Sequence, residues 1–292
     1  LSGGRLIRTS RDDKAGDTAG TLEDYACVAE GFLTLYGVTG EARWLRLAAG
    51  LLAAVHLAGG RLVRTSRDGT AGGTAGALDD HACVAEGFLT LSGVTGEARW
   101  MQLAGRLLEV ALGSFGDGQG GFFDTAVNDE ALIFRPADPA DNATPSGTFA
   151  VAGALLGFSA LARSARHREA AGAALGVLPG IAARYPRAAG AGLAVAEAWL
   201  AGPPEIAVVG SPRDDRTRAL HETALHAAPP GAVLALGDGT GSTAAGSEGG
   251  VPLLAGRGLV DGAPAAYVCR QFACQAPVTT PEQLRQALAG PS

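Results

Sequence analysis

Apolar residues recur at helical spacing along the N-terminal part of the chain. A first stripe lies on one face of a helix and comprises Leu22, Tyr25, Ala26, Ala29, Phe32, Leu33 and Tyr36. A second stripe follows Gly40 and comprises Trp44, Leu47, Ala48, Leu51, Leu52 and Val55. Two amphipathic helices separated by a short glycine-containing turn predict a helical hairpin.

This hairpin unit occurs twice in the sequence. Residues 3–52 and 59–108 align without a gap, and 38 of the 50 aligned pairs are identical. Each copy opens with a polar, glycine-rich segment that is too long for a tight turn, so we expect a short β-hairpin or ordered loop at one end of the helices. The repeat is longer than the units of common helical solenoids, and it fits hairpins joined by long loops in an α/α toroid.

The rest of the chain divides near Gly202. Before this point the pattern predicts short strands at residues 122–126 and 131–134, then helices at 147–163, 168–177 and 188–200. After it we expect strands at 205–210 and 232–236 and helices at 216–226 and 281–289.

The predicted fold is therefore mainly α. Residues 1–202 should form an incomplete α/α toroid of helical hairpins with short β-hairpin insertions, and residues 203–292 a small α/β C-terminal domain. One extra hairpin either replaces a lost one or prevents the ring from closing. We therefore expect the second copy to lie nearer than the first to the usual position of this hairpin in the toroid.

Composition and charge narrow the function classes. Hydrophobic residues make up 47% of the chain and the net charge is −6, which suits a packed globular protein. The absence of a dense basic stripe argues against a nucleic-acid partner, and no apolar run is long enough to predict a membrane partner. No secretory signal pattern is present, so a cytoplasmic location is expected. No motif predicts a cofactor or a metal site.

Acidic residues mark the start of the repeated core-facing helix, at residues 23–24 and 79–80. Carboxylates in a toroid's central cavity can act as general acid and base on a sugar, which makes Asp80, Asp124 and Asp141 candidate catalytic residues. The alternative is that acidic residues in a first turn complement the helix dipole. Both interpretations stay open.

Candidate binding residues surround the same loops. Substrate-binding candidates are Arg67, Asp68, His81 and Arg135; the competing interpretation is solvated salt bridges within the loops. Cys269 and Cys274 are separated by four residues and form a candidate redox pair, against the alternative of buried, idle thiols.

Three stretches together resemble a known family. They are Leu-Glu-Asp-Tyr-Ala at residues 22–26, Gly-Gly-Phe-Phe-Asp-Thr at 120–125 leading to Ala-Thr-Pro-Ser-Gly at 143–147, and Ala-Tyr-Val-Cys-Arg-Gln-Phe-Ala-Cys-Gln-Ala-Pro-Val at 266–278. They are similar to the thioredoxin-domain family that includes spermatogenesis-associated protein 20. The resemblance implies a thioredoxin-like domain followed by a toroid like those of six-hairpin glycosidases and N-acylglucosamine 2-epimerases.

This chain departs from that pattern in several places. It contains no Cys-x-x-Cys motif, so the thioredoxin-like domain is expected to be missing and the chain to be a C-terminal part. Asn142 and Thr148 stand where the family motif has Gly and Asn, and His81 stands where the first copy has Tyr25.

Two functional hypotheses follow. The first is a toroid that binds or acts on a small carbohydrate, with enzymatic activity left open. The alternative is a non-catalytic accessory or interaction module of a redox, thioredoxin-like protein. Only analogy with the fold suggests a carbohydrate ligand, so the residues of the site are needed to distinguish the two hypotheses.

Overall fold

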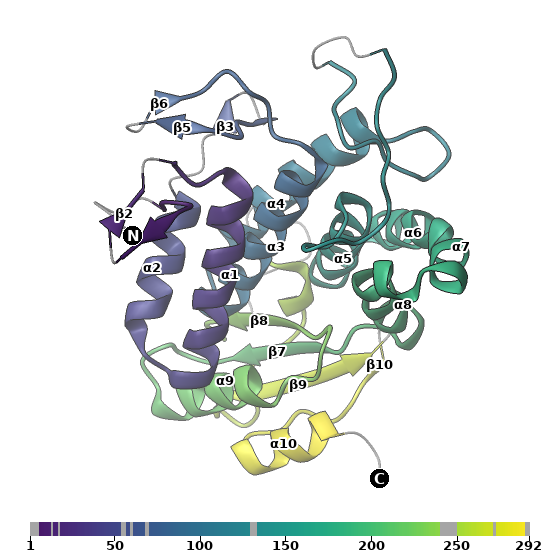
Figure 1. The fold of residues 1–292 in the computed structure, drawn as a ribbon. Coiled ribbons are helices and arrows are strands. Elements are labelled where there is room, and N and C mark those ends of the chain that lie inside the picture. The colour runs from purple at the N-terminus through teal and green to yellow at the C-terminus, as the bar shows by residue number, and fades with distance from the viewer. Residues whose placement is uncertain are drawn as a thin grey trace.

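Paired helices make up most of the protein in its computed structural model (Figure 1). The structure describes residues 6–12, 14–16, 18–53, 57–58, 61–67, 70–128, 133–239, 250–270 and 273–289. None of the helices in these ranges is both long and apolar enough to cross a membrane.

Four helical hairpins follow one another among the described residues. They are α1 (Leu22–Thr39) with α2 (Ala42–Ala53), α3 (Leu78–Thr95) with α4 (Ala98–Val110), α5 (Gly147–Ala162) with α6 (Ala165–Ala174), and α7 (Leu178–Arg184) with α8 (Gly190–Ala201). Gly40 and Gly96 end α1 and α3 at φ of 67° and 73°, a left-handed conformation that glycine adopts without a Cβ penalty.

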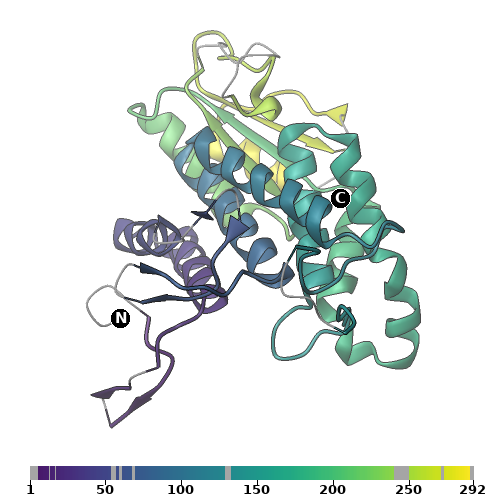
Figure 2. The same cartoon turned by 90° about the horizontal axis from the view of Figure 1, so that it is seen from above.

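The hairpins form a curved row. Helix α1 packs on α3, α3 packs on α5, and α5 packs on α8, so each pair contacts the next pair through one helix (Figures 1 and 2). This arrangement is the incomplete, mainly helical toroid that the apolar pattern predicts. Among the described α-helices, only α7 was not predicted from the sequence, because Pro179 and Gly180 interrupt the helical pattern there.

Short β-hairpins precede α1 and α3, as predicted. They are β1 (Ser10–Arg11) with β2 (Lys14–Ala15) and β5 (Ser66–Arg67) with β6 (Thr70–Ala71); β3 (Leu57–Ala58) pairs with β4 (Arg61–Leu62) between them. The strand predicted at residues 122–126 is wrong: only an isolated bridge between Gly116 and Phe122 forms there. The carbonyl of Thr125 instead accepts a hydrogen bond from Nε of Arg135 at 3.1 Å. Residues 131–132 of the other predicted strand lie outside the described residues.

The two copies are packed to different depths. Leu35 and Val38 of α1 are 40% and 71% exposed, whereas their counterparts Leu91 and Val94 of α3 are 0% and 7% exposed. The difference arises because α3 lies between α1 and α5 and also contacts strand β8 (Val233–Gly237). The second copy is therefore the more deeply packed of the two.

A four-stranded sheet follows the hairpins. Its strands β7 (Glu205–Val209), β8, β9 (Ala265–Arg270) and β10 (Ala273–Cys274) lie in the order β10-β9-β7-β8, with β7 parallel to β8 and antiparallel to β9. One face buries Ala207 and Ala235 in the helical core, and the other packs on α9 (Asp215–Ala227) and α10 (Pro281–Ala289). The sheet therefore shares a core with the helices.

Candidate functional site

A pocket lies where the N-terminal ends of α3 and α5 meet. Its volume is about 340 Å³, and its polar lining comprises Arg64, Asp79, Asp124, Thr125, Asp138, Asn142, Thr144 and Ser146. We call it the acidic pocket. The N-terminal end of a helix carries a partial positive charge, so two such ends help to balance the carboxylates gathered here.

Backbone contacts hold the walls of the acidic pocket together. The amide of Leu78, the first residue of α3, donates to the carbonyl oxygen of Asp124 at 3.0 Å. Gly147 opens α5, and a Cβ added there would lie 3.2 Å from the Asp79 nitrogen. A glycine at this position therefore lets the two helix starts approach closely.

Asp124 occupies a partly dehydrated position in this pocket. Burial raises the pKa of its carboxyl group, a hydrogen bond from the Asp138 amide to Oδ2 at 3.1 Å opposes that rise, and the negative charges of Asp138 and Asp79 add to it. The net effect is a raised pKa. Asp124 therefore holds a proton more readily than an ordinary aspartate does.

Asp79 has different surroundings. Its Oδ2 lies 3.6 Å from Nη2 of Arg64, and its Oδ1 accepts a hydrogen bond from the Asp80 amide at 3.0 Å. The pocket thus combines Asp124, whose pKa is raised, with Asp79, which lies beside a guanidinium and accepts a hydrogen bond from a backbone amide.

Asp80, a predicted catalytic residue, does not line the pocket. It is 0% exposed, and its Oδ2 accepts from the Ala77 amide at 2.8 Å and lies 3.3 Å from Nε of Arg64. Asp24 makes the same contacts in the first copy, with the Thr21 amide at 2.7 Å and Arg8 at 3.1 Å. The helix-start interpretation therefore describes Asp80, and Asp79 takes its place in the lining.

Asp141 also accepts hydrogen bonds from backbone amides. Its Oδ1 accepts from the Ser146 amide at 2.9 Å and its Oδ2 from the Ala191 amide at 2.8 Å. Both oxygens are engaged, so Asp141 joins the starts of α5 and α8 rather than facing a ligand. Ser146 caps α5 as its sequence position indicates, because its Oγ accepts from the Phe149 amide at 3.2 Å.

Two predicted binding residues have structural contacts instead. His81 is buried, with Nδ1 at 2.8 Å from the Ala77 carbonyl oxygen and its ring 5.0 Å from that of Phe115. Arg135 donates to the Ser114 carbonyl oxygen at 3.0 Å and lies 4.1 Å over the Phe123 ring. Neither side chain is part of the pocket lining.

The remaining predicted residues are less informative about the pocket. The backbone of Arg67 lies in β5, and Asp68 lies outside the described residues. Cys269 and Cys274 form a disulfide in the sheet, away from the pocket. Asp138 and Asn142 could not be predicted as pocket residues, because the segment around them has neither helical nor strand periodicity.

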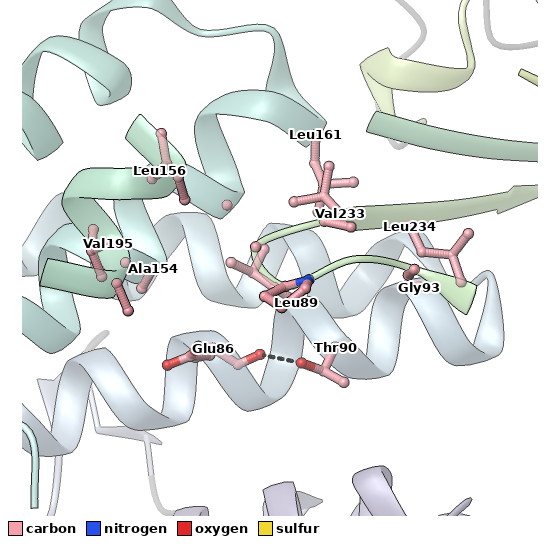
Figure 3. Close-up of a pocket in the computed structure, with 18 of the residues that line it drawn as sticks. Glu86, Leu89, Thr90, Gly93, Ala154, Leu156, Leu161, Val195, Val233 and Leu234 are labelled. Atoms are coloured by element: carbon pink, nitrogen blue, oxygen red, sulfur yellow. Dashed lines mark hydrogen bonds between the residues drawn. The ribbon is translucent and has the colours of Figure 1, made fainter. Parts of the chain in front are cut away.

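A second, larger cavity lies between α3, α5, α8 and β8 (Figure 3). It has a volume of about 560 Å³ and walls that include Leu89, Leu156, Val195 and Val233. Glu86 reaches water at this cavity, yet the surrounding protein displaces enough solvent to raise its pKa to about 7, with the charge of Glu30 adding to the effect. We call this cavity between α3, α5, α8 and β8 the apolar cavity.

The described residues contain no group of three or more His, Cys, Asp or Glu side chains placed to hold a metal ion. The polar chemistry is concentrated in the acidic pocket, which makes it the candidate functional site.

Comparison with known proteins supports the resemblance seen in the sequence. The fold is mainly helical, with successive hairpins and a small sheet. No protein-family model matches the chain. The chain is homologous to spermatogenesis-associated protein 20. The human protein is 30% identical over 242 residues, which are 80% of this chain, and the rat protein is 29% identical over 239 residues.

The match covers only part of those relatives. This chain spans 30% of the length of the human and rat proteins. Among solved structures, a selenomethionine derivative of a GH76 α-mannanase from Bacteroides thetaiotaomicron aligns at a TM-score of 0.49 with 12% identity, covering 78% of this chain and 66% of that one.

Proposed function

We propose that the acidic pocket binds a small carbohydrate or related polyol. The carboxylates of Asp79, Asp124 and Asp138 are acceptors for hydroxyl groups, while Arg64 and Asn142 supply donors. A polyol presents donors and acceptors at close intervals, which suits such a mixed lining. The pocket volume of about 340 Å³ fits a small ligand.

The unlike surroundings of Asp79 and Asp124 carry this proposal. Burial raises the pKa of Asp124, whereas the charge of Asp79 is balanced by Arg64 at 3.6 Å. Two carboxyl groups that line one pocket in different surroundings can act as general acid and general base. In a reaction at this site, Asp124 would donate a proton and Asp79 would accept one.

A ligand screen with two variants tests the proposal. Thermal unfolding of the full chain would be followed with neutral, amino and acidic monosaccharides and disaccharides at millimolar concentration. A bound sugar at ten times its dissociation constant should stabilise the folded state by about 1.4 kcal/mol. Asp79→Asn and Asp124→Asn should abolish that gain. Calorimetric titration would then give the affinity of each variant.

The duplication provides a matched control. Glu23 of the first copy aligns with Asp79 of the second, so Glu23→Gln changes the equivalent position of the other copy. Sugar binding should be unaffected by this substitution. A panel that gives no stabilisation at all, or stabilisation that survives both Asp79→Asn and Asp124→Asn, would refute the proposal.

The competing proposal is a non-catalytic accessory module of a thioredoxin-like redox protein. It is favoured by the engagement of Asp80 and Asp141 with backbone amides, which removes two of the three predicted catalytic carboxylates from ligand contact. Under this proposal the sugar panel gives no stabilisation, and Asp124→Asn leaves the binding of a partner protein unchanged.

A further inference from the structure

A disulfide lies at the edge of the four-stranded sheet, far along the chain from the acidic pocket. Cys269 and Cys274 occupy facing positions on β9 and β10 and are bonded to each other. Cys269 is 1% exposed, whereas Cys274 lies on the exposed edge strand β10. The bond therefore presents one sulfur to solvent and keeps the other in the protein.

Arg257 lies against the buried side of this bond. Its Nη2 is 3.0 Å from Sγ of Cys269 and 3.4 Å from Sγ of Cys274. The side chain is 6% exposed, and its Nε and Nη1 have no hydrogen-bond partner among the described residues. A buried guanidinium is costly unless an anion or several acceptors satisfy it.

A disulfide is a poor partner for such a cation, because its sulfurs are neutral and accept hydrogen bonds weakly. Reduction would change that, because a thiolate is a full negative charge. A thiolate on Cys269 would lie in direct contact with the Arg257 guanidinium, and a neighbouring cation stabilises a thiolate. The site is thus better matched to the reduced pair than to the bonded one.

We propose that Cys269 and Cys274 are a redox-active thiol–disulfide pair in which Arg257 stabilises the Cys269 thiolate released on reduction. The co-reactant is a dithiol. This inference is independent of sugar binding, because neither the cysteines nor Arg257 line the acidic pocket.

The reaction follows from the unequal exposure of the two sulfurs. A thiolate of the dithiol attacks Sγ of Cys274, a new S–S bond forms, and the electron pair of the broken bond leaves on Sγ of Cys269. The second thiol of the dithiol then loses its proton to water and attacks the mixed disulfide, releasing Cys274. The dithiol is oxidised to a disulfide, and two electrons reduce the protein pair.

Glu205 faces Cys269 across β7 and β9. Burial raises the pKa of Glu205, and the charges of Arg163 and Arg257 oppose that rise. Arg163 adds a second positive charge near Arg257. The ring of Tyr267 lies 5.9 Å from the guanidinium.

The other cysteines have the opposite environment. A hydrogen bond with the Cys27 thiol, followed by burial and nearby carboxylates, raises the pKa of Cys83. Cys27 and Cys83 are not disulfide-bonded. They can be replaced by serine to leave Cys269 and Cys274 as the reporting pair.

The first experiment is a redox titration of the folded full chain carrying Cys27→Ser and Cys83→Ser. The protein is equilibrated with mixtures of reduced and oxidised dithiothreitol, trapped with a maleimide, and scored by mass. We expect a reversible two-electron transition while circular dichroism shows the chain folded. A bond that resists dithiothreitol until the chain unfolds, or thiols that never oxidise, would overturn the proposal.

The second experiment tests Arg257 directly. With Arg257→Gln, reduction by dithiothreitol should slow about tenfold, because the leaving thiolate loses its cation. Arg257→Lys should recover most of that rate, which a merely structural role would not require. In a chain that also carries Cys274→Ser, thiolate absorbance at 240 nm against pH should place Cys269 below the usual thiol pKa of about 8.5. A Cys269 pKa at or above that value would contradict the role of Arg257, whether or not the Gln variant folds well.

Discussion

Nε2 of His221 lies 2.9 Å from the carbonyl oxygen of Gly93, 128 residues earlier in the chain. Because a carbonyl can only accept, Nε2 carries the proton and donates it, which fixes the neutral tautomer with hydrogen on Nε2. The contact ties α9 of the C-terminal part to the last turn of α3 in the second hairpin. Among the described residues, none makes the corresponding contact with the first copy of the hairpin.

Gly93→Ala should destabilise the protein. A Cβ at Gly93 would lie 2.7 Å from the Leu234 carbonyl oxygen, so β8 would have to move away from α3. We expect a loss of about 1 to 3 kcal/mol in the free energy of unfolding, measured by urea denaturation.

Gly37→Ala provides the control, because Gly37 is the same position in the first copy and a Cβ there meets nothing within 4 Å. Alanine in a helix interior should stabilise by roughly 0.5 to 1 kcal/mol. Equal effects at Gly37 and Gly93 would show that the two copies do not differ in packing as described.

His221 should make stability fall in mild acid. Burial lowers its pKa and outweighs the hydrogen bond to Gly93, so the unfolded chain takes up a proton that the folded chain resists. The free energy of unfolding should therefore fall as pH drops below about 6.5, the ordinary histidine pKa.

Urea denaturation at several pH values checks this. His221→Gln should flatten the dependence in part, and His167, whose pKa burial also lowers, should account for a separate part. A profile that is the same in His221→Gln as in the original chain would contradict a neutral, buried His221.

Glu86 should titrate near neutrality. Its pKa is raised to about 7 by burial and by the charge of Glu30, so the folded chain holds a proton that the unfolded chain has lost above about pH 4.5. Stability should therefore decrease as pH rises from about 4.5 to 7, and Glu86→Gln should remove this decrease. Carboxyl carbon NMR would measure the titration directly.

Glu30→Gln separates the two causes. Removing the Glu30 charge should lower the pKa of Glu86 while leaving the effect of burial. A Glu86 pKa that does not move in Glu30→Gln would mean that the two carboxylates do not interact.

Asp141→Ala should cost about 1 to 3 kcal/mol of stability, since it leaves the amides of Ser146 and Ala191 without their acceptor. Asp138→Ala is the comparison, because Asp138 is exposed and its Oδ1 accepts a hydrogen bond from the nearby Ala140 amide. Chemical denaturation of both variants should show the larger loss for Asp141. A negligible loss there would contradict its place between α5 and α8.

The apolar periodicity was sufficient to predict the helical pairs, because amphipathic stripes such as the one that begins at Leu22 report directly on burial. The positions of carboxylates were harder to predict. Asp79 and Asp80 are adjacent in sequence, but a helix turns neighbouring side chains by about 100°, so one lines the acidic pocket and the other is buried. Strand β9 was missed because its pairing with β7 is a long-range contact that local pattern does not encode.

The contacts of Arg135 and Asp141 depend on tertiary structure in the same way. Each is a charged residue in an irregular segment, and only the folded chain shows that Ser114, Thr125 and Ala191 supply their partners. Sequence analysis could identify both as polar loop residues. It could not separate a ligand contact from a backbone contact.

The most direct test of a carbohydrate site is an NMR titration of the full chain with a monosaccharide identified by the thermal screen. The proposal predicts saturable shifts of the backbone amide signals of Asp79, Asp138 and Asn142, with one affinity, and their loss in Asp124→Asn. Signals of Glu30 and its neighbours in the first copy should stay in place. Absence of saturable shifts at all three residues, or shifts confined to the apolar cavity around Leu89 and Val195, would contradict it.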